Sequence, residues 1–536
     1  MGEGRLLVAG QTCWRTETAD RLAVIVDAAD YFHHVKAAML RARRRIILIG
    51  WDFDYRMTFE GGAKSLAGPN QFGDFLRWLV RRRSGLEICV LKSNLGLVPT
   101  LQTMWRGVIP VSLLNRVSSE RLQFAVDGAH PTGAVHHQKI VVIDDAVAFC
   151  GGIDLTLERW DTPDHRDDNA FRRTGDRSYG PRHEVAVAVD GAAARTLSEQ
   201  ARNRWRAATG QFLAPVAAPG TVWPRGLDAT LGPVEIGIAR TLPDLPPAHE
   251  AREVEALNFA AIATARDVLY LENQYLASRS IAEALAARLR EPDGPEVVVV
   301  LPRCSESPLE RTAMDTARHA MLQLLWAADE HRRFAAFWPV TERGTSIYVH
   351  SKVLVADQRL LRIGSSNLNN RSLGFDSECD VAVEADPRDG QDEPVRRVIT
   401  EVRDRLIAEH LGVPADEFTA TADRTGSFLA AIRALAGEGR TLCEFTAATV
   451  ADEAGPLAEN DLMDPDHVPA SLSRSVQRLL TDLANRSSWN GYADTMSPED
   501  RAPDTESDAA DGQTDVPSAN PAYATPPPEG IPDADG

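Results

Sequence analysis

Two short stretches of the chain repeat one pattern of polar residues. Residues 137–144 read His-x-Lys followed by four residues and an Asp, and residues 350–357 read the same. A histidine can act as a nucleophile or a proton carrier near neutral pH, and a lysine ammonium is a compact charge that suits phosphate oxygens. The repeated pattern therefore indicates chemistry on a phosphate group. Its members are His137, Lys139, Asp144, His350, Lys352 and Asp357.

Lysine is rare in this chain, so its place in both stretches is informative. Of the 58 Lys and Arg residues only five are Lys, and two of these five belong to the repeated pattern. With 13 His, chance gives roughly 0.1 His-x-Lys pairs when matches are counted position by position. A third pair, His34 and Lys36, lacks the following Asp and lies in a run with helical periodicity, so we interpret it as structural.

The repeat continues downstream of both aspartates. The sequence distance from His137 to His350 is 213 residues. At this same offset, Gly151, Gly152 and Asp154 of the first half correspond to Gly364, Ser365 and Asn367 of the second. Residues 184–189 then match residues 378–383 at an offset of 194, so the loop 159–181 holds 19 extra residues, which is 213 less 194. Glu184 and Glu378 open these segments and are candidates to orient the histidines by accepting an Nδ1 proton. Solvation at a strand edge is the alternative.

Apolar runs follow each lysine and predict the strands that position these side chains. Residues 140–143 and 353–356 are short and apolar, as expected of a buried strand with an aspartate at its end. Alternate residues of a strand share a face, so the His and Lys of each pattern point the same way. Further strands are predicted at residues 22–26, 46–49, 86–91, 268–271 and 296–301, and helices at residues 31–42, 251–264, 280–289, 308–328 and 394–411. Residues 46–49 of the first half align with residues 268–271 of the second, and residues 87–91 align with 296–300. The repeat therefore extends upstream of the motifs.

The doubled pattern predicts the architecture as well as the site. We expect an α/β protein of two similar mixed-sheet domains flanked by helices, related by a pseudo-twofold axis with the active site between them. The expected parts are an N-terminal domain at 1–212 with its motif at 137–154, a Pro/Gly-rich linker at 213–232, a C-terminal domain at 233–485 with its motif at 350–367 and a helical extension, and an acidic disordered tail at 486–536. The apolar segment 95–114 fits either a buried helix or a lid that contacts lipid.

The composition of the chain limits which binding partners and which cellular location are expected. The net charge is −19, of which the last 46 residues contribute −10 through eleven acids and one Arg, and neither part of the chain suggests a nucleic-acid footprint. The six Cys are scattered singly, so we expect reduced thiols rather than disulfides or metal ligands. No apolar run is long enough to span a bilayer. We expect a cytoplasmic protein or one peripheral to the membrane, and secretion without a recognisable signal peptide stays open.

The paired His-x-Lys-x4-Asp motif resembles the signature of the phospholipase D superfamily. The resemblance is closer to plant-like and bacterial phospholipases D than to the nuclease or cardiolipin synthase branches, and it spans roughly residues 10 to 470. The segments that carry it are His136-His137, 151–155 and 159–163 in the first half, 272–275 between the motifs, and 347–350, Arg371-Ser372 and Glu378 in the second half.

The resemblance implies hydrolysis of a glycerophospholipid to phosphatidate and a head-group alcohol through a phosphohistidine. His137 is then the nucleophile and His350 the general acid, while Lys139 and Lys352 bind the non-bridging oxygens. The other substrate-binding candidates are Gly152, Asp154, Ser365 and Asn367. Asn367 can donate to the phosphate, whereas an ionised Asp154 cannot, so the role of Asp154 stays open. Asp144 and Asp357 are expected to brace the site rather than take part in the chemistry.

No cofactor and no metal are expected, because two histidines and two lysines supply nucleophile, acid and charge neutralisation. A phospholipid is the expected partner, with peripheral contact to the membrane and no nucleic acid, and the sequence does not define the oligomeric state. The alternatives are a cardiolipin synthase-type phosphatidyltransferase, with transphosphatidylation as a related activity, then a nuclease, and a non-catalytic protein that binds lipid. In the loop 159–181 we expect His165 to be a surface residue, with contact to a head group as the alternative.

Overall fold

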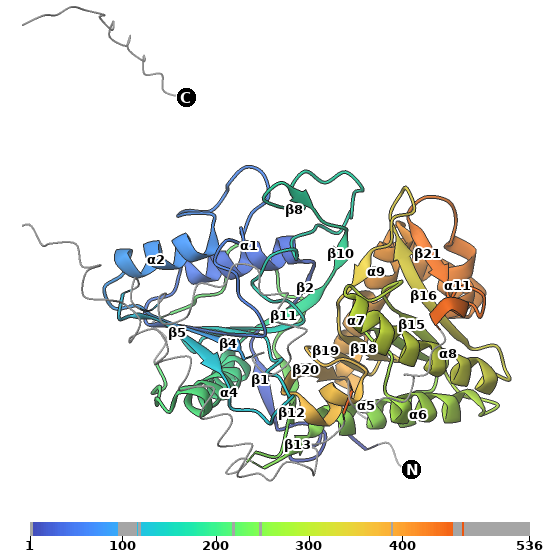
Figure 1. The fold of residues 1–536 in the computed structure, drawn as a ribbon. Helices are drawn as coiled ribbons and strands as arrows, with labels where there is room; N and C mark the ends of the chain where they lie inside the picture. The colour runs from blue at the N-terminus through green and yellow to red at the C-terminus, as the bar shows by residue number, and fades with distance from the viewer. Residues whose placement is uncertain are drawn as a thin grey trace, which may run out of the picture. The chain divides into compact units, whose positions relative to one another are not determined.

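A computed structural model of the chain describes residues 4–94, 115, 119–216, 220–245, 249–386, 390–453 and 464–465. The segment 95–114 and the acidic tail, for which a helix or lid and disorder were expected, lie outside these residues. Figure 1 shows the two halves of the chain, with the first in blue and cyan and the second in green to orange.

The first half builds a seven-stranded mixed sheet from the predicted apolar runs. Its strands, in spatial order, are β2 (Leu22–Val26), β11 (Val185–Asp190), β7 (Val147–Gly151), β6 (Ile140–Ile143), β3 (Arg45–Gly50), β4 (Glu87–Ser93) and β5 (Leu122–Asp127). Helices α1 (Ala28–Met39) and α2 (Phe72–Arg82) cover one face, and α4 (Gly191–Thr209) covers the other (Figure 1). Burial on both faces explains why these strands are apolar throughout rather than alternating.

The second half repeats this sheet and extends it at both edges to ten strands. The repeated strands, in spatial order, are β12 (Val234–Leu242), β20 (Glu378–Glu384), β19 (Leu360–Gly364), β18 (Val353–Ala356), β14 (Val268–Glu272), β15 (Glu296–Val300) and β16 (Phe334–Val340). The additions are β1 (Arg15–Ala19), β13 (Ala251–Arg252) and β21 (Thr441–Glu444). The helices of this half are α5 (Glu253–Thr264), α6 (Arg279–Leu289), α7 (Pro308–Glu310), α8 (Thr316–Ala328), α9 (Glu393–Leu411), α10 (Ala415–Thr425) and α11 (Phe428–Leu435).

The strand pairing has the register that the sequence repeat predicts, with one difference. Gly151 pairs with Ala186 in the first sheet and Gly364 with Asp380 in the second, which are the offsets of 213 and 194. Upstream, the alignment of 46–49 with 268–271 is wrong by one residue. Ile46 pairs with Ile143, whereas Leu269 pairs with Ala356, so Ile46 corresponds to Leu269. An apolar run alone does not specify register, because a slip by one residue still places apolar side chains on both faces.

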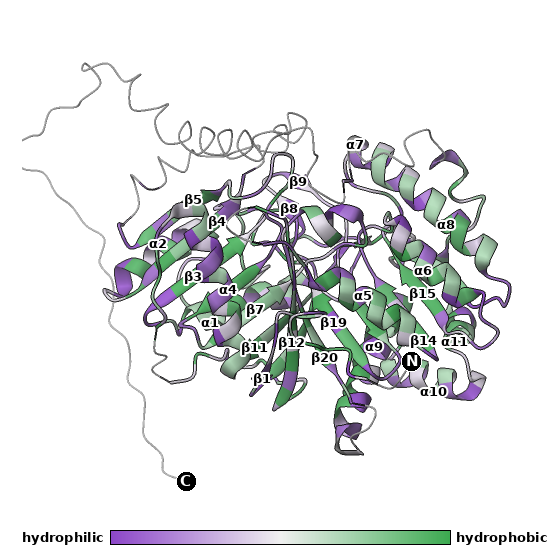
Figure 2. Ribbon diagram, turned by 90° about the horizontal axis from the view of Figure 1, so that it is seen from below, coloured by the Kyte–Doolittle hydropathy of each residue, from purple (hydrophilic) through white to green (hydrophobic). Residues whose placement is uncertain are grey.

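The two sheets share one hydrophobic core. In β3, Ile46 and Leu48 pack with α1 and α2, while the alternate residues Ile47 and Ile49 join a cluster that also contains strand residues of the second sheet. That shared cluster includes α4 and parts of α9, α10 and α11, and the outer face of the second sheet packs on α5, α6 and α8. Figure 2 shows strands rich in hydrophobic residues between helices that carry both hydrophobic and hydrophilic residues.

The expected domain boundaries differ from the structure at both ends of the first half. The strand β1 pairs with β12 of the second sheet, and Glu384 accepts the backbone N–H groups of Leu6 and Leu7 at 2.7 and 2.9 Å. Leu6, Leu7 and β1 therefore bond to the second sheet, although they lie in the expected domain 1–212. In the linker, Leu213, Trp223 and Leu231 are buried, so its described part is packed rather than extended between domains.

Candidate active site

Each histidine of the repeated pattern faces a glutamate from the opposite half of the chain. His137 Nδ1 lies 2.9 and 3.0 Å from the two carboxylate oxygens of Glu378, and His350 Nδ1 lies 3.1 Å from Glu184 Oε1. The sequence identified both glutamates as candidates to orient a histidine, and the structure places both there. It adds that the pairing crosses between the halves, so neither half holds a complete His–Glu pair.

The two His-x-Lys segments lead into their strands rather than forming part of them. The ladder of β6 begins at Ile140 and that of β18 at Val353, one residue after each lysine. His137 is fixed by its backbone N–H, which donates to Ser377 O at 3.0 Å, and His350 likewise by His183 O at 2.8 Å. Both anchoring carbonyls come from the opposite half, and this brings the two segments together.

Both lysines are buried and point back toward the histidine of their own segment. Lys139 Nζ donates to His137 O at 3.0 Å and lies 3.2 Å from Asp154 Oδ2. Lys352 Nζ donates to His350 O at 2.6 Å and to Gln274 Oε1 at 3.1 Å. The two ammonium groups are therefore held by neutral carbonyls and a single carboxylate, which leaves positive charge at the site for an anion.

The aspartates of the pattern lie at the far ends of their strands from the histidines. Asp144 has φ 53°, is fully buried, and accepts the backbone N–H groups of Arg43, Arg44 and Arg45 at 2.7 to 2.8 Å. Asp357 does the same at the start of β14, where it accepts three N–H groups at 2.8 to 2.9 Å. Both side chains tie two strands together, as expected of residues that brace the site.

The downstream positions of the repeat differ chemically between the halves. Asp154 accepts the backbone N–H groups of Trp51 and Asp52 at 2.9 and 3.3 Å and pairs with Lys139. Its counterpart Asn367 is 5% exposed and its Oδ1 has no hydrogen-bond partner. The Asp154 carboxylate is thus occupied in holding a lysine, whereas the Asn367 amide is not held in this way.

Gly152 and Ser365 also occupy corresponding places with different contacts. A Cβ atom at Gly152 would lie 3.1 Å from His350 O and 3.3 Å from Lys352 Cδ, so a larger residue would press on the second motif. Ser365 Oγ instead donates to Glu378 Oε2 at 2.5 Å. The serine belongs to the support of a glutamate, and neither residue offers a side-chain group that is free for substrate.

Sequence reasoning assigned no role to three residues that complete this support. Ser372 Oγ donates to Glu378 Oε1 at 2.7 Å, whereas Arg159 and Arg182 lie 3.7 and 3.8 Å from Glu184 Oε1 without hydrogen-bond alignment. At the offset of 213, Ser372 corresponds to Arg159, so the repeat itself contained this signal. One glutamate is held by hydroxyl groups and the other by guanidinium groups.

Burial and like charges shift the pKa values of the site. Burial first, and then Lys139 and Lys352, lower the pKa of His137 well below its ordinary value. Burial and then Lys352 lower the pKa of His350 well below 6.5, and burial and then Lys139 lower the pKa of Lys352. Burial raises the pKa of Glu184 to about 7. The lysine of each half thus lowers the pKa of the histidine of the other half, so both motifs belong to one site. Because the pKa of His137 is lowered, this residue is neutral near pH 7.

The structure corrects the interpretation of His165. His165 is fully buried and not a surface residue. It joins Asp27, His183 and Glu409 in a group whose ligand atoms all lie within 4.8 Å of one another, and a second such group contains His183, Glu272 and His410. These residues come from distant segments, so no spacing in the sequence indicates them.

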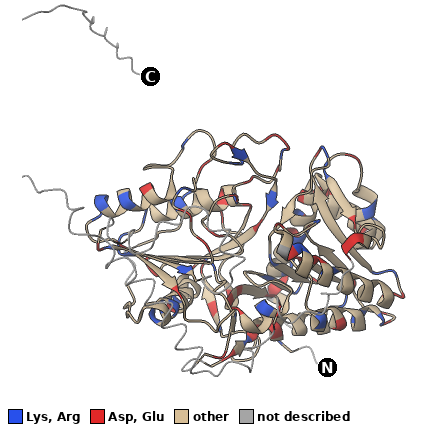
Figure 3. Ribbon diagram, in the orientation of Figure 1, with Lys and Arg blue, Asp and Glu red and all other residues tan. Residues whose placement is uncertain are grey.

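The third His-x-Lys pair and the cysteines have the surroundings that the sequence predicts. Lys36 Nζ pairs with Glu60 Oε2 at 2.8 Å, which confirms the third His-x-Lys pair as structural. All six cysteines are free. Among the described residues, no helix is long and apolar enough to cross a membrane. Acidic and basic residues are interspersed along the helices of both halves (Figure 3).

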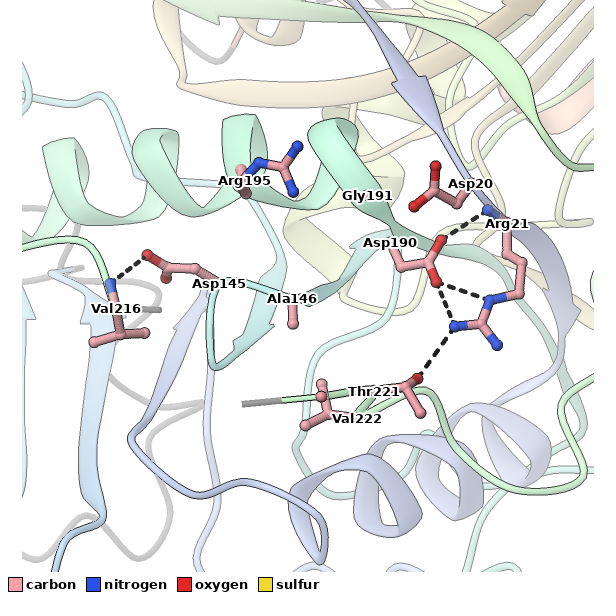
Figure 4. A pocket seen from close by; sticks show the side chains of 11 residues that line it. Asp20, Arg21, Asp145, Ala146, Asp190, Gly191, Arg195, Val216, Thr221 and Val222 are labelled. Atoms are coloured by element: carbon pink, nitrogen blue, oxygen red, sulfur yellow. Dashed lines mark hydrogen bonds and ion pairs between the residues drawn. The ribbon is translucent and has the colours of Figure 1, made fainter. Parts of the chain in front are cut away.

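A pocket of about 450 Å³ lies on the first half, away from the histidines. Arg21 and Asp190 form an ion pair at its wall (Figure 4). None of the residues of either motif from His137 to Lys139 or from His350 to Lys352 lines it. The chemistry of the paired motifs therefore does not belong to this pocket.

The fold and site together define a two-half α/β protein with paired His-x-Lys segments at one site. The family model described as phospholipase D matches residues 38–219 and 323–457, together more than half of the chain. The chain belongs to the phospholipase D family.

Curated relatives with this name match at low identity. Phospholipase D1 of Saccharomyces cerevisiae is 25% identical over 504 residues, which cover 73% of this chain and 29% of the relative. Phospholipase D alpha 4 of Arabidopsis thaliana is 24% identical over 468 residues, which cover 67% of this chain and 60% of the relative. The chain thus spans less than two thirds of the length of these relatives. Among solved structures, a phosphatidylserine synthase of Haemophilus influenzae Rd KW20 has 11% identity and a TM-score of 0.46, and the match covers 74% of this chain and 88% of that one.

Proposed function

We propose that this chain is a phospholipase D that hydrolyses the head-group phosphodiester of glycerophospholipids. The observation that carries the proposal is the crossed pairing of His137 with Glu378 and of His350 with Glu184, next to two buried lysines. The names of the relatives support a phospholipid substrate. Phospholipids reside in bilayers, so the proposal includes peripheral contact with a membrane surface.

In the first step His137 attacks the phosphorus atom. Its Nδ1–H donates to Glu378, which leaves the lone pair of Nε2 for the attack and stabilises the positive charge of the product imidazole. The P–O bond to the head group breaks, and His350 in its protonated form gives its Nε2 proton to the leaving oxygen. Burial and the nearby cations disfavour this form in the free protein, and the negative charge of a bound phosphodiester would favour it. The products are a phosphohistidine on His137, the free alcohol and a neutral His350.

In the second step water replaces the histidine on phosphorus. Neutral His350 takes a proton from the water, the oxygen attacks phosphorus, and the P–N bond to His137 breaks. Phosphatidate leaves, His137 is neutral again and His350 is protonated again. An alcohol in place of water gives transphosphatidylation by the same exchange of bonds.

We assign charge stabilisation in both steps to the lysines and Asn367. Lys139 and Lys352 would bind the non-bridging oxygens, whose negative charge develops in the transition state. The Nδ2 group of Asn367 would donate to the same oxygens. Asp154 would position Lys139 by their contact at 3.2 Å, and this is a role that an ionised carboxylate can perform.

Product analysis tests the proposal. The protein is incubated separately with phosphatidylcholine, phosphatidylglycerol and single-stranded DNA, with and without ethanol. We expect phosphatidate from phospholipid, phosphatidylethanol when ethanol is present, and intact DNA. Cardiolipin formed from phosphatidylglycerol without phosphatidate would identify a phosphatidyltransferase instead. Cleaved DNA with intact lipid would overturn the proposal, and a His137→Asn variant controls for contaminating enzymes.

A further inference from the structure

A second group of polar side chains is buried directly behind Glu184. Asp27 follows β2, His165 lies in the loop inserted in the first half, His183 precedes Glu184, and Glu409 lies on α9 of the second half. The side chains of Asp27, His165 and His183 are 0% exposed and that of Glu409 is 8% exposed. Burial of so many ionisable groups requires compensation, because each charged group loses its hydration.

The four potential ligand atoms are spaced as metal ligands are. His165 Nε2 lies 3.5 Å from Asp27 Oδ2 and 3.4 Å from Glu409 Oε1. His183 Nδ1 lies 3.4 Å from Asp27 Oδ1 and 3.0 Å from Glu409 Oε1. Ligands at about 2.0 to 2.1 Å from a tetrahedral Zn²⁺ are separated by about 3.3 Å. The four distances lie around this value.

The nitrogen of each imidazole that faces away from the group meets another carboxylate. His165 Nδ1 donates to Asp161 Oδ2 at 2.9 Å, and His183 Nε2 donates to Glu272 Oε2 at 3.1 Å. Histidines that bind metal through one nitrogen commonly donate the other N–H to a carboxylate, which fixes the ring and its tautomer. In the neutral form of each imidazole with its proton on this outer nitrogen, the inner nitrogen is unprotonated and can bind a cation.

Two atoms that face the centre of the group lack hydrogen-bond partners. Asp27 Oδ2 and His165 Nε2 are fully buried and neither makes a hydrogen bond. Buried polar atoms are nearly always satisfied in native proteins, so an orphaned pair at one point indicates a missing binding partner.

The group holds more carboxylates than neighbouring guanidinium groups. Its four carboxylates are Asp27, Asp161, Glu272 and Glu409, and the guanidinium groups near them are Arg172, at 3.2 Å from Asp161, and Arg440, at 3.9 Å from Glu409. With neutral imidazoles two negative charges remain uncompensated. One divalent cation or two protons on the histidines can neutralise them.

We propose that Asp27, His165, His183 and Glu409 bind one divalent transition metal ion, Zn²⁺ by ligand type, in a structural site that joins the two halves. Imidazole and carboxylate ligands in a closed four-coordinate arrangement suit Zn²⁺. The third imidazole, His410, is not a ligand. Its Nε2 lies 3.2 Å from the second oxygen of Glu272, so it supports the outer carboxylate.

The proposed site is connected to the active site through the backbone. Asp27 Oδ1 accepts the N–H of Glu184 at 3.0 Å, and the carbonyl of His183 accepts the N–H of His350 at 2.8 Å. The ion would therefore fix the segment that presents Glu184 to His350. It is not placed to contact the phosphate, so its role is positional and not chemical.

Metal content of the full chain tests the proposal. The protein is produced in medium with added zinc, dialysed against EDTA while folded, and analysed for all first-row metals. We expect about one zinc per chain, because fully buried ligands exchange slowly. A second sample is unfolded, stripped and refolded with Co²⁺, where we expect the strong visible absorption of tetrahedral cobalt.

Matched variants separate a metal site from a network of protonated histidines. His165→Gln removes a ligand, and its metal content is expected to be lower than that of the wild-type protein by a factor of about ten or more. His410→Gln changes an equally buried imidazole of the same cluster and is expected to retain the metal. If His165→Gln does not fold, Asp27→Asn takes its place. Folded wild-type protein without stoichiometric metal, and without a cobalt spectrum after refolding, would overturn the proposal whatever the lipid assays show.

Discussion

At the scale of single residues, the two histidines differ in how firmly their glutamates are held. Glu378 accepts hydrogen bonds from Ser365 and Ser372 as well as from His137, whereas neither oxygen of Glu184 makes an aligned hydrogen bond. A fixed carboxylate holds its imidazole in one tautomer and orientation, which suits a nucleophile. The looser contact lets His350 serve first the leaving oxygen and then water. The asymmetry supports His137 as the attacking residue.

Replacing His350 by Asn is expected to trap the intermediate. Without the general base, water attacks slowly, and a substrate whose leaving group needs little protonation still reacts with His137. Acid-labile phosphate should then accumulate on a peptide that contains His137, detected by mass spectrometry under alkaline conditions. Phosphate on a peptide that contains His350, in a His137→Asn variant, would reverse the two roles.

The pH profile of kcat/KM is expected to have its acid limb below pH 6.5. His137 must be neutral to attack, and burial with the two lysines lowers its pKa, so activity is lost on the acid side as the pH falls through this lowered value. His350 must be protonated and its pKa is lowered as well, so activity is also expected to decline as the pH rises through the pKa of His350. The variant His34→Asn, which alters the structural His-x-Lys pair, should give the same limb. A limb centred above pH 6.5 in the unaltered enzyme contradicts this electrostatic account.

At the scale of elements, the aspartate that ends each motif strand holds the next strand in place. Asp144 lies with φ 53° at the end of β6 and accepts three successive N–H groups before β3. The motif thus combines chemistry at one end of a short strand with architecture at the other. This explains how one spacing serves two unrelated purposes.

The change Asp144→Ala is expected to lower the free energy of unfolding by about 1–3 kcal/mol, because three partly buried N–H groups lose their acceptor. The kcat of the folded fraction should stay close to that of the unaltered enzyme. Asp144→Asn keeps one acceptor oxygen and tolerates positive φ, so it should cost less. Chemical denaturation followed by activity assays below the unfolding transition measures both effects. A large loss of kcat with unchanged stability would show that Asp144 takes part in the chemistry.

The sequence predicted much of this element plan because the pattern occurs twice. The strands β2, β6 and β18 have the bounds that their apolar runs predict, and α9 ends before Gly412, whose φ of 68° explains the stop. The one-residue error near Ile46 arose where only apolar residues were aligned. The contacts of Glu184 and Glu378 with the histidines of the opposite halves could not be derived from the sequence offsets. An offset shows which residues of the two halves are equivalent, but not which residues pack together.

At the scale of the whole molecule, the two halves depend on each other for both core and site. One hydrophobic cluster contains strand residues of both sheets, and β1 from the start of the chain completes the second sheet. His165 shows why this scale escapes sequence reasoning. Its loop looks polar and exposed, but two of the side chains around it are Asp27 and, almost 250 residues later on α9, Glu409.

Adding EDTA to the folded enzyme is expected to leave the rate of lipid hydrolysis unchanged. Lys139 and Lys352 supply the positive charge at the phosphate, and the ligands of the proposed zinc site are buried and so protected from the chelator. The rate before and after overnight incubation with EDTA measures this, with calcium-depleted vesicles as substrate. Rapid loss of activity that added metal restores would place a metal in the reaction itself.

The crossed pairing of histidines and glutamates has a consequence for synthesis of the chain. When the first half emerges from the ribosome, His137 and Lys139 are present but Glu378 has not been translated. The nascent half has no carboxylate to align its nucleophile and no second histidine to release a product. Under the proposed function, lipid cleavage would therefore begin only after both halves are made and docked.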